Sequence, residues 1–146
     1  MPLPKCASDG ANVTVLLDAT ALVALHVEGP GRAVVSGALE SDTNWAACAI
    51  ALTEAVAATS RLTDESVLAR LVEDGVRHMW DFLHVVPLDQ ALLDDAAGLC
   101  AEQPIAVSTA LHLAAARRLP APVRFVTFDA SQIPVTLALG FEVVSA

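Results

Sequence analysis

The stretch VTVLLDATALVAL, residues 13–25, decides the fold. Its first five residues are an apolar run typical of a buried β-strand, and the run ends at Asp18; residues 21–25 have the composition of a short helix. In open α/β sheets, ligands bind at the carboxyl ends of strands, so an acidic residue where a strand gives way to a helix is a candidate functional residue. The alternative is that Asp18 only caps the helix, because aspartate there accepts hydrogen bonds from free backbone N–H groups.

Short apolar strands and helices alternate along the rest of the chain. Strands are expected at residues 13–17, 45–50, 84–88, 123–128 and 141–144, and helices at 21–25, 32–39, 51–62, 64–80, 89–102, 109–119 and 133–139. Residues 28–31 are expected to form a turn, and Thr63 and Ser108 to cap the helices that follow them. Strands that are apolar throughout indicate a parallel sheet covered on both faces. The prediction is an α/β fold, a three-layer α/β/α sandwich with a central, mainly parallel four- or five-stranded sheet.

Composition favours a cytoplasmic protein without a membrane segment. Residues 1–11 are expected to be a flexible N-terminal tail and residues 12–146 a single domain. No apolar run reaches the ~18 residues of a membrane span, and the N-terminus lacks the apolar segment of a secretory signal. The three cysteines are far apart, which fits a reducing compartment. The net charge of −9 argues against tight binding of nucleic acid by phosphate contacts alone.

Three acidic residues form a candidate metal site. Asp18 and Asp129 each follow an expected strand, and Glu54 is the only charged residue between Asn44 and Arg61. Alternatively, Glu54 is a charged residue on the solvent-facing side of its helix. If the first and fourth strands are neighbours, both aspartates face one crevice, and carboxylates that close need a cation such as Mg²⁺ or Mn²⁺. A metal held by carboxylates activates water, so the pattern indicates metal-dependent phosphodiester hydrolysis.

Other chemistries lack their motifs. The nucleotide-binding patterns GxxxxGK[ST] and GxGxxG and the esterase pattern GxSxG do not occur. Thr20 stands where a haloacid-dehalogenase-type enzyme has a second aspartate. The four histidines show no metal-ligand spacing, so each, His112 included, is expected to be an ordinary core or surface residue.

Over residues 13–144 the chain resembles PIN-domain toxins of the VapC type. The resemblance rests on four segments in order: VTVLLDATALVAL, ALTEAVAATSRL, STALHLAAARRL, and FVTFDASQI with LALGFEV. It implies a small endoribonuclease with an acidic Mg²⁺ or Mn²⁺ site, usually a homodimer, neutralised by a VapB-like antitoxin. Carried over by position, the catalytic and metal-binding acids would be Asp18, Glu54 and Asp129, with Thr20 and Thr127 in support.

Thr109 departs from the family pattern. The family typically reads DALHLA where this chain reads TALHLA, so the site loses one negative ligand. A hydroxyl can still contact Mg²⁺, and other acids could compensate, namely Asp94, Asp95 or Glu102. The sequence leaves three interpretations: a working ribonuclease with a weakened site, a degenerate PIN-domain protein that binds its antitoxin and dimerises without efficient cleavage, or a toxin carrying an inactivating substitution.

Overall fold

The structure, a computed structural model, describes residues 13–145. One sheet has the strand order β4-β3-β2-β5-β6, and every neighbouring pair is parallel. The strands are β2 (Thr14–Leu17), β3 (Asn44–Cys48), β4 (His84–Val86), β5 (Val123–Val126) and β6 (Glu142–Val144). The helices are α1 (Ala19–Ala24), α2 (Pro30–Ser41), α3 (Ile50–Leu62), α4 (Ser66–Trp80), α5 (Gln90–Glu102), α6 (Val107–Arg117), the 3-10 helix η1 (Ala130–Gln132) and α7 (Ile133–Ala138). The predicted α/β sandwich is confirmed, with five strands, all parallel.

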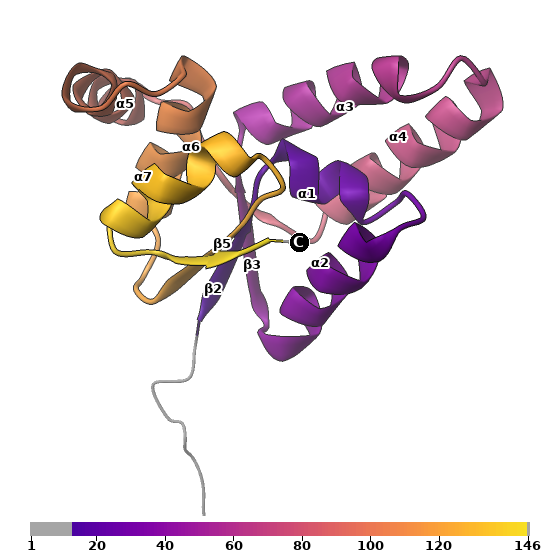
Figure 1. The fold of residues 1–146 in the computed structure, drawn as a ribbon, viewed down its shortest axis with the longest axis horizontal. Coiled ribbons are helices and arrows are strands. Elements are labelled where there is room, and N and C mark those ends of the chain that lie inside the picture. The colour runs from indigo at the N-terminus through magenta and orange to yellow at the C-terminus, as the bar shows by residue number, and fades with distance from the viewer. Residues whose placement is uncertain (1–12, 146) are drawn as a thin grey trace, which may run out of the picture.

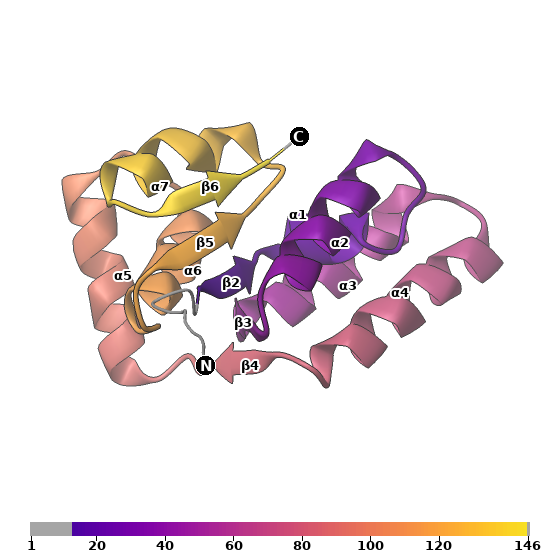
Figure 2. The same ribbon diagram turned by 90° about the horizontal axis from the view of Figure 1, so that it is seen from below.

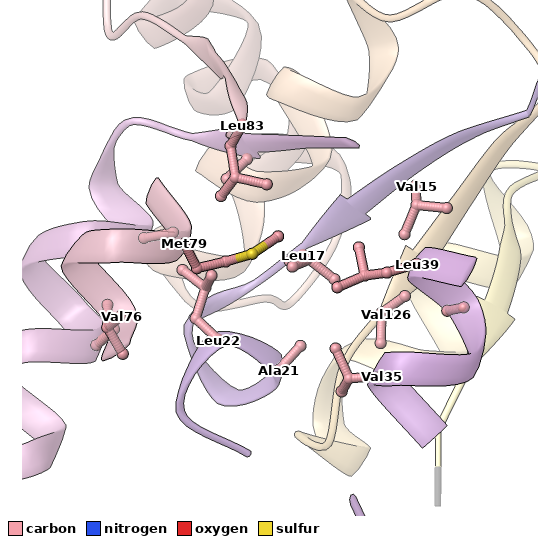
Figure 3. Packing of buried hydrophobic residues seen from close by; sticks show 14 residues of the cluster. Val15, Leu17, Ala21, Leu22, Val35, Leu39, Val76, Met79, Leu83 and Val126 are labelled. Carbon is pink, nitrogen blue, oxygen red and sulfur yellow. The ribbon is translucent and has the colours of Figure 1, made fainter. Parts of the chain in front are cut away.

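A layer of helices covers each face of the sheet (Figures 1 and 2). Helices α1 to α4 pack on one face, and α5, α6 and α7 on the other. Successive side chains of β2 enter opposite layers: Val15 and Leu17 join the first, and Leu16 the second. Figure 3 shows Leu17 in one apolar cluster with Leu22 of α1 and Met79 of α4. Burial on both faces explains why this strand is a continuous apolar run.

Three helix starts differ from the prediction. Helix α2 begins at Pro30, inside the expected turn, because proline suits the first position of a helix. The N-cap of α4 is Glu65; Thr63 precedes it, and its hydroxyl accepts a hydrogen bond from the Glu65 N–H at 3.1 Å. The N-cap of α6 is Ala106, so Ser108 lies in the first turn of the helix and does not cap it. Because Ser108 does not cap the helix, its side chain is free to make a contact at the candidate site.

The expected tail, residues 1–11, lies outside the described residues. Within residues 13–145, no helix is both long enough and apolar enough to cross a membrane. That one domain extends over residues 12–146 stays a prediction.

Gly75→Ala is expected to destabilise the protein by about 1 kcal/mol or more. A Cβ at Gly75 would lie 2.5 Å from Nδ1 and 2.8 Å from Cγ of His26, so the ring would have to move. The matched control is Gly98→Ala in α5, where nothing lies within 4 Å of the added Cβ. The control should gain about 0.5–1 kcal/mol, because alanine is the better helix former. Urea denaturation measures both; equal stabilisation of the two variants would contradict the close contact.

Candidate functional site

Asp18 lies buried at the carboxyl end of β2, with 1% of its surface exposed. Its Oδ1 accepts hydrogen bonds from the Thr20 hydroxyl at 2.6 Å and from the Ala21 N–H at 2.9 Å. Its Oδ2 accepts one from the Thr127 hydroxyl at 2.5 Å. Asp18 therefore caps α1, as one sequence-based interpretation expected, and its second oxygen contacts the segment after β5; a role in ligand binding stays a prediction.

Two threonines connect Asp18 to the segment after β5. Strand β5 pairs directly with β2, which is the condition under which both aspartates were expected to face one crevice. The Thr127 hydroxyl, which donates to Asp18, also accepts a hydrogen bond from the Asp129 N–H at 3.0 Å. The Thr20 hydroxyl accepts one from the Phe128 N–H at 2.8 Å. These hydroxyls hold the carboxyl ends of the two strands in a fixed relation.

Asp129 follows β5, and its carboxylate binds the start of η1. Oδ1 accepts hydrogen bonds from the N–H and the hydroxyl of Ser131, at 3.0 and 2.6 Å, and Oδ2 accepts a long one, 3.4 Å, from Gln132. Asp129 is half-buried. The structure thus places Asp18 and Asp129 at the same edge of the sheet, with Thr127 between them.

Glu54 projects from α3 and is bound by α6. Its Oε2 accepts a short hydrogen bond from the Ser108 hydroxyl, and its Oε1 lies 2.7 Å from Nε2 of His112. His112 is 1% exposed and Glu54 is half-buried. Glu54 is therefore not a solvent-facing residue, and its half-buried carboxylate has hydrogen-bond partners on α6.

The three acids differ in their pKa. Burial raises the pKa of Asp18 above its ordinary value, although the hydrogen bonds from Thr127, Thr20 and Ala21 oppose the change. Burial alone would also raise the pKa of Glu54, but the hydrogen bonds from His112 and Ser108 outweigh it and lower the pKa. The Ser131 hydroxyl is the main cause of a lowered pKa at Asp129. Glu54 and Asp129 are therefore ionised at neutral pH, and Asp18 is the acid whose charge the fold opposes.

Thr109 is buried near the start of α6, directly after Ser108, with 4% of its surface exposed. The acids that could have replaced its missing charge, Asp94, Asp95 and Glu102, are all exposed on α5. Asp94 accepts a hydrogen bond from the Gln90 amide at 2.9 Å. The structure gives no sign that α5 supplies the lost ligand.

The donor set fits a divalent cation in its chemistry, because Mg²⁺ and Mn²⁺ take carboxylate and hydroxyl oxygens. Its arrangement is less favourable. In the described part of the chain, no three His, Cys, Asp or Glu side chains are grouped so that they could hold a metal ion. Asp18 and Asp129 lie at one edge of the sheet, whereas the carboxylate of Glu54 is hydrogen-bonded to Ser108 and His112 of α6.

Ser108 and His112 are the site residues that sequence reasoning missed. Each contacts a residue more than fifty positions away in the sequence. Their spacing of four positions places both on one face of a helix, and this was the available signal. It becomes informative only once α6 is known to pack beside α3.

The fold and the site define a class: a parallel α/β protein with acidic residues at the carboxyl ends of its central strand and of the strand beside it. The PIN domain family matches residues 15–135, and the chain belongs to this family. None of the curated proteins shows a significant match to the sequence.

Several solved structures share the fold at low sequence identity. FitAcB from Neisseria gonorrhoeae is 16% identical, with a TM-score of 0.69 over 90% of this chain and 96% of that one. VapC20 from Mycobacterium tuberculosis, described as a toxin that cleaves the sarcin-ricin loop, is 14% identical, with a TM-score of 0.66 over 88% and 96%. A toxin-antitoxin complex from Klebsiella pneumoniae is 18% identical, with a TM-score of 0.63 over 83% and 93%.

Proposed function

We propose that this PIN-domain protein is a metal-dependent endoribonuclease that acts as the toxin of a type II toxin–antitoxin system in the cytoplasm. The observation that carries the proposal is the position of Asp18 and Asp129 at the carboxyl ends of adjacent parallel strands, joined through Thr127. The family and its toxin neighbours support it.

In this proposal Asp18, Asp129 and Glu54 would hold Mg²⁺ or Mn²⁺. The bound ion would supply a Lewis acid that activates water and neutralises charge on the scissile phosphate. Thr20 and Thr127 orient Asp18 by hydrogen bonds to its two oxygens. Hydrogen-bond donors that orient a ligating carboxylate are a regular part of metal sites.

A partner surface supports the antitoxin part of the proposal. A groove of about 920 Å³ runs between α1, α2 and α4, and its walls include Leu25, Leu68 and Leu71 with Glu28 and Arg32. Contiguous apolar surface rimmed by polar residues often marks a site of contact with another protein. We propose that a VapB-like antitoxin covers this groove and that the toxin forms a homodimer.

A second function follows from a specific observation. With threonine at position 109, the site has one acid fewer than the family pattern, and the carboxylate of Glu54 is hydrogen-bonded to Ser108 and His112. If these two features weaken metal binding, the protein is a degenerate toxin that keeps its partner surfaces and cleaves RNA poorly or not at all.

RNA cleavage with and without metal separates the two functions. The purified protein, incubated with a fluorescence-quenched RNA oligonucleotide pool, is expected to cleave in Mn²⁺ or Mg²⁺ and to stop in EDTA. Native mass spectrometry of the protein co-expressed with the product of the upstream gene reports on the partner. Complex formation without cleavage in either metal would contradict the nuclease and support the degenerate toxin.

A further inference from the structure

Helix α6 offers two hydrogen-bond donors to one carboxylate. Ser108 and His112 are four residues apart and so lie on the same face of the helix. They contact different oxygens of Glu54: the Ser108 hydroxyl donates to Oε2, and Nε2 of His112 lies 2.7 Å from Oε1. Both oxygens of Glu54 are therefore engaged by α6, and the contact joins α6 to α3.

The His112 ring depends on this contact. Its other nitrogen, Nδ1, is buried and has no hydrogen-bond partner within residues 13–145. If Glu54 turned toward a metal ion, both ring nitrogens would lack a partner in a residue that is 1% exposed. A buried polar group without a partner costs free energy, so the ring opposes the movement of Glu54.

The residue at position 109 sets the charge of α6 directly beside Ser108. An aspartate at this position would add a negative charge to α6 next to a residue that binds Glu54. Thr109 carries no charge, so α6 can bind Glu54 directly through donors. Each donor takes one lone pair of a Glu54 oxygen and reduces the negative charge that this oxygen would offer to a cation.

We propose that Ser108 and His112 are positioning residues that compete with a divalent cation for Glu54 and so weaken metal binding at the site. This inference rests on the proposed function, since it concerns the same three acids. The opposite role is also known for such donors: they can orient a metal ligand, and their loss then lowers metal affinity about 10- to 100-fold. The two roles predict changes of opposite sign.

Titration of the metal-free protein with Mn²⁺ by isothermal calorimetry tests the competition. Ser108→Ala and His112→Leu, each of which removes one donor, are expected to bind Mn²⁺ about tenfold tighter than the wild type. The matched control is His112→Gln, whose amide can still donate to Glu54, and it should bind as the wild type does. Circular dichroism and thermal denaturation check folding. Ser108 is only half-buried, so Ser108→Ala stays informative if the His112 variants unfold.

Unchanged or weaker binding in folded Ser108→Ala and His112→Leu would overturn the competition. Failure of the proposed function would look different. If the wild type and both variants bind no Mn²⁺, the metal site and the competition are both wrong. If the wild type binds Mn²⁺ and Asp18→Asn does not, but the α6 variants match the wild type, only the competition is wrong.

Discussion

Asp18→Asn is expected to reduce RNA cleavage about a hundredfold or more while leaving the protein at least as stable as the wild type. A metal contributes several kcal/mol to such a reaction, and each ~1.4 kcal/mol is a factor of ten in rate. Asparagine keeps the size of the side chain and one oxygen for the cap of α1, but it removes the charge that would bind the cation. Cleavage of a fluorescence-quenched RNA measures the loss.

The free energy of unfolding of Asp18→Asn should not fall, because the wild-type carboxylate is buried. Burial raises the pKa of Asp18 in the folded protein above its unfolded value. The ionised form therefore costs stability progressively as the pH rises through these two values, and asparagine removes this cost at neutral pH. Urea denaturation at pH 7 measures the change. A large loss of stability would mean that Asp18 serves mainly to hold β2 to β5.

Asp89→Asn is the matched control. Asp89 caps α5 as Asp18 caps α1, by accepting a hydrogen bond from the backbone N–H three residues later. It also binds Arg118, whose side chain lines a pocket with Thr14 and Asn44 at the amino ends of the strands. The control should therefore cleave RNA at the wild-type rate. An equal loss of cleavage in both variants would contradict a specific role for Asp18.

The strands could be predicted because most of them are local runs of apolar residues, and the inner strands β2 and β5 are buried almost throughout. The same local signal places Asp18 and Asp129 at strand ends. That their strands are neighbours was only a condition of the prediction, since pairing between residues more than a hundred positions apart leaves no local pattern. In the structure β2 and β5 are parallel neighbours, so this condition is met. Metal binding by these acids stays a prediction.

The contacts of Glu54 could not be predicted from the sequence, for a related reason. Ser108 has the composition of a helix cap, and a local rule assigns it that role. The helix instead begins two residues earlier, with Ala106 as its cap, and the packing of α6 beside α3 turns Ser108 and His112 toward Glu54. A histidine without a nearby partner in the sequence looks like an ordinary core residue until this packing is known.

Thr109→Asp is expected to tighten Mn²⁺ binding at least about tenfold and to increase RNA cleavage. It restores the acid that the family pattern has at this position, and a buried carboxylate attracts a divalent cation strongly. Without metal, the new charge lies in a buried position next to Ser108, so the metal-free variant should be less stable than the wild type by about 1–3 kcal/mol. Saturating Mn²⁺ should recover that stability, because a ligand that binds only the folded state stabilises it.

Thr109→Asn separates charge from size. Asparagine has nearly the volume of aspartate but no negative charge, so it should bind Mn²⁺ no better than threonine does. Calorimetry gives the affinities, and thermal denaturation with and without Mn²⁺ gives the stabilities. If Thr109→Asp is destabilised and Mn²⁺ neither binds tighter nor restores it, position 109 does not belong to a metal site. The interpretation of this chain as a ribonuclease weakened at one ligand would then give way to that of a PIN-domain protein that acts by binding alone.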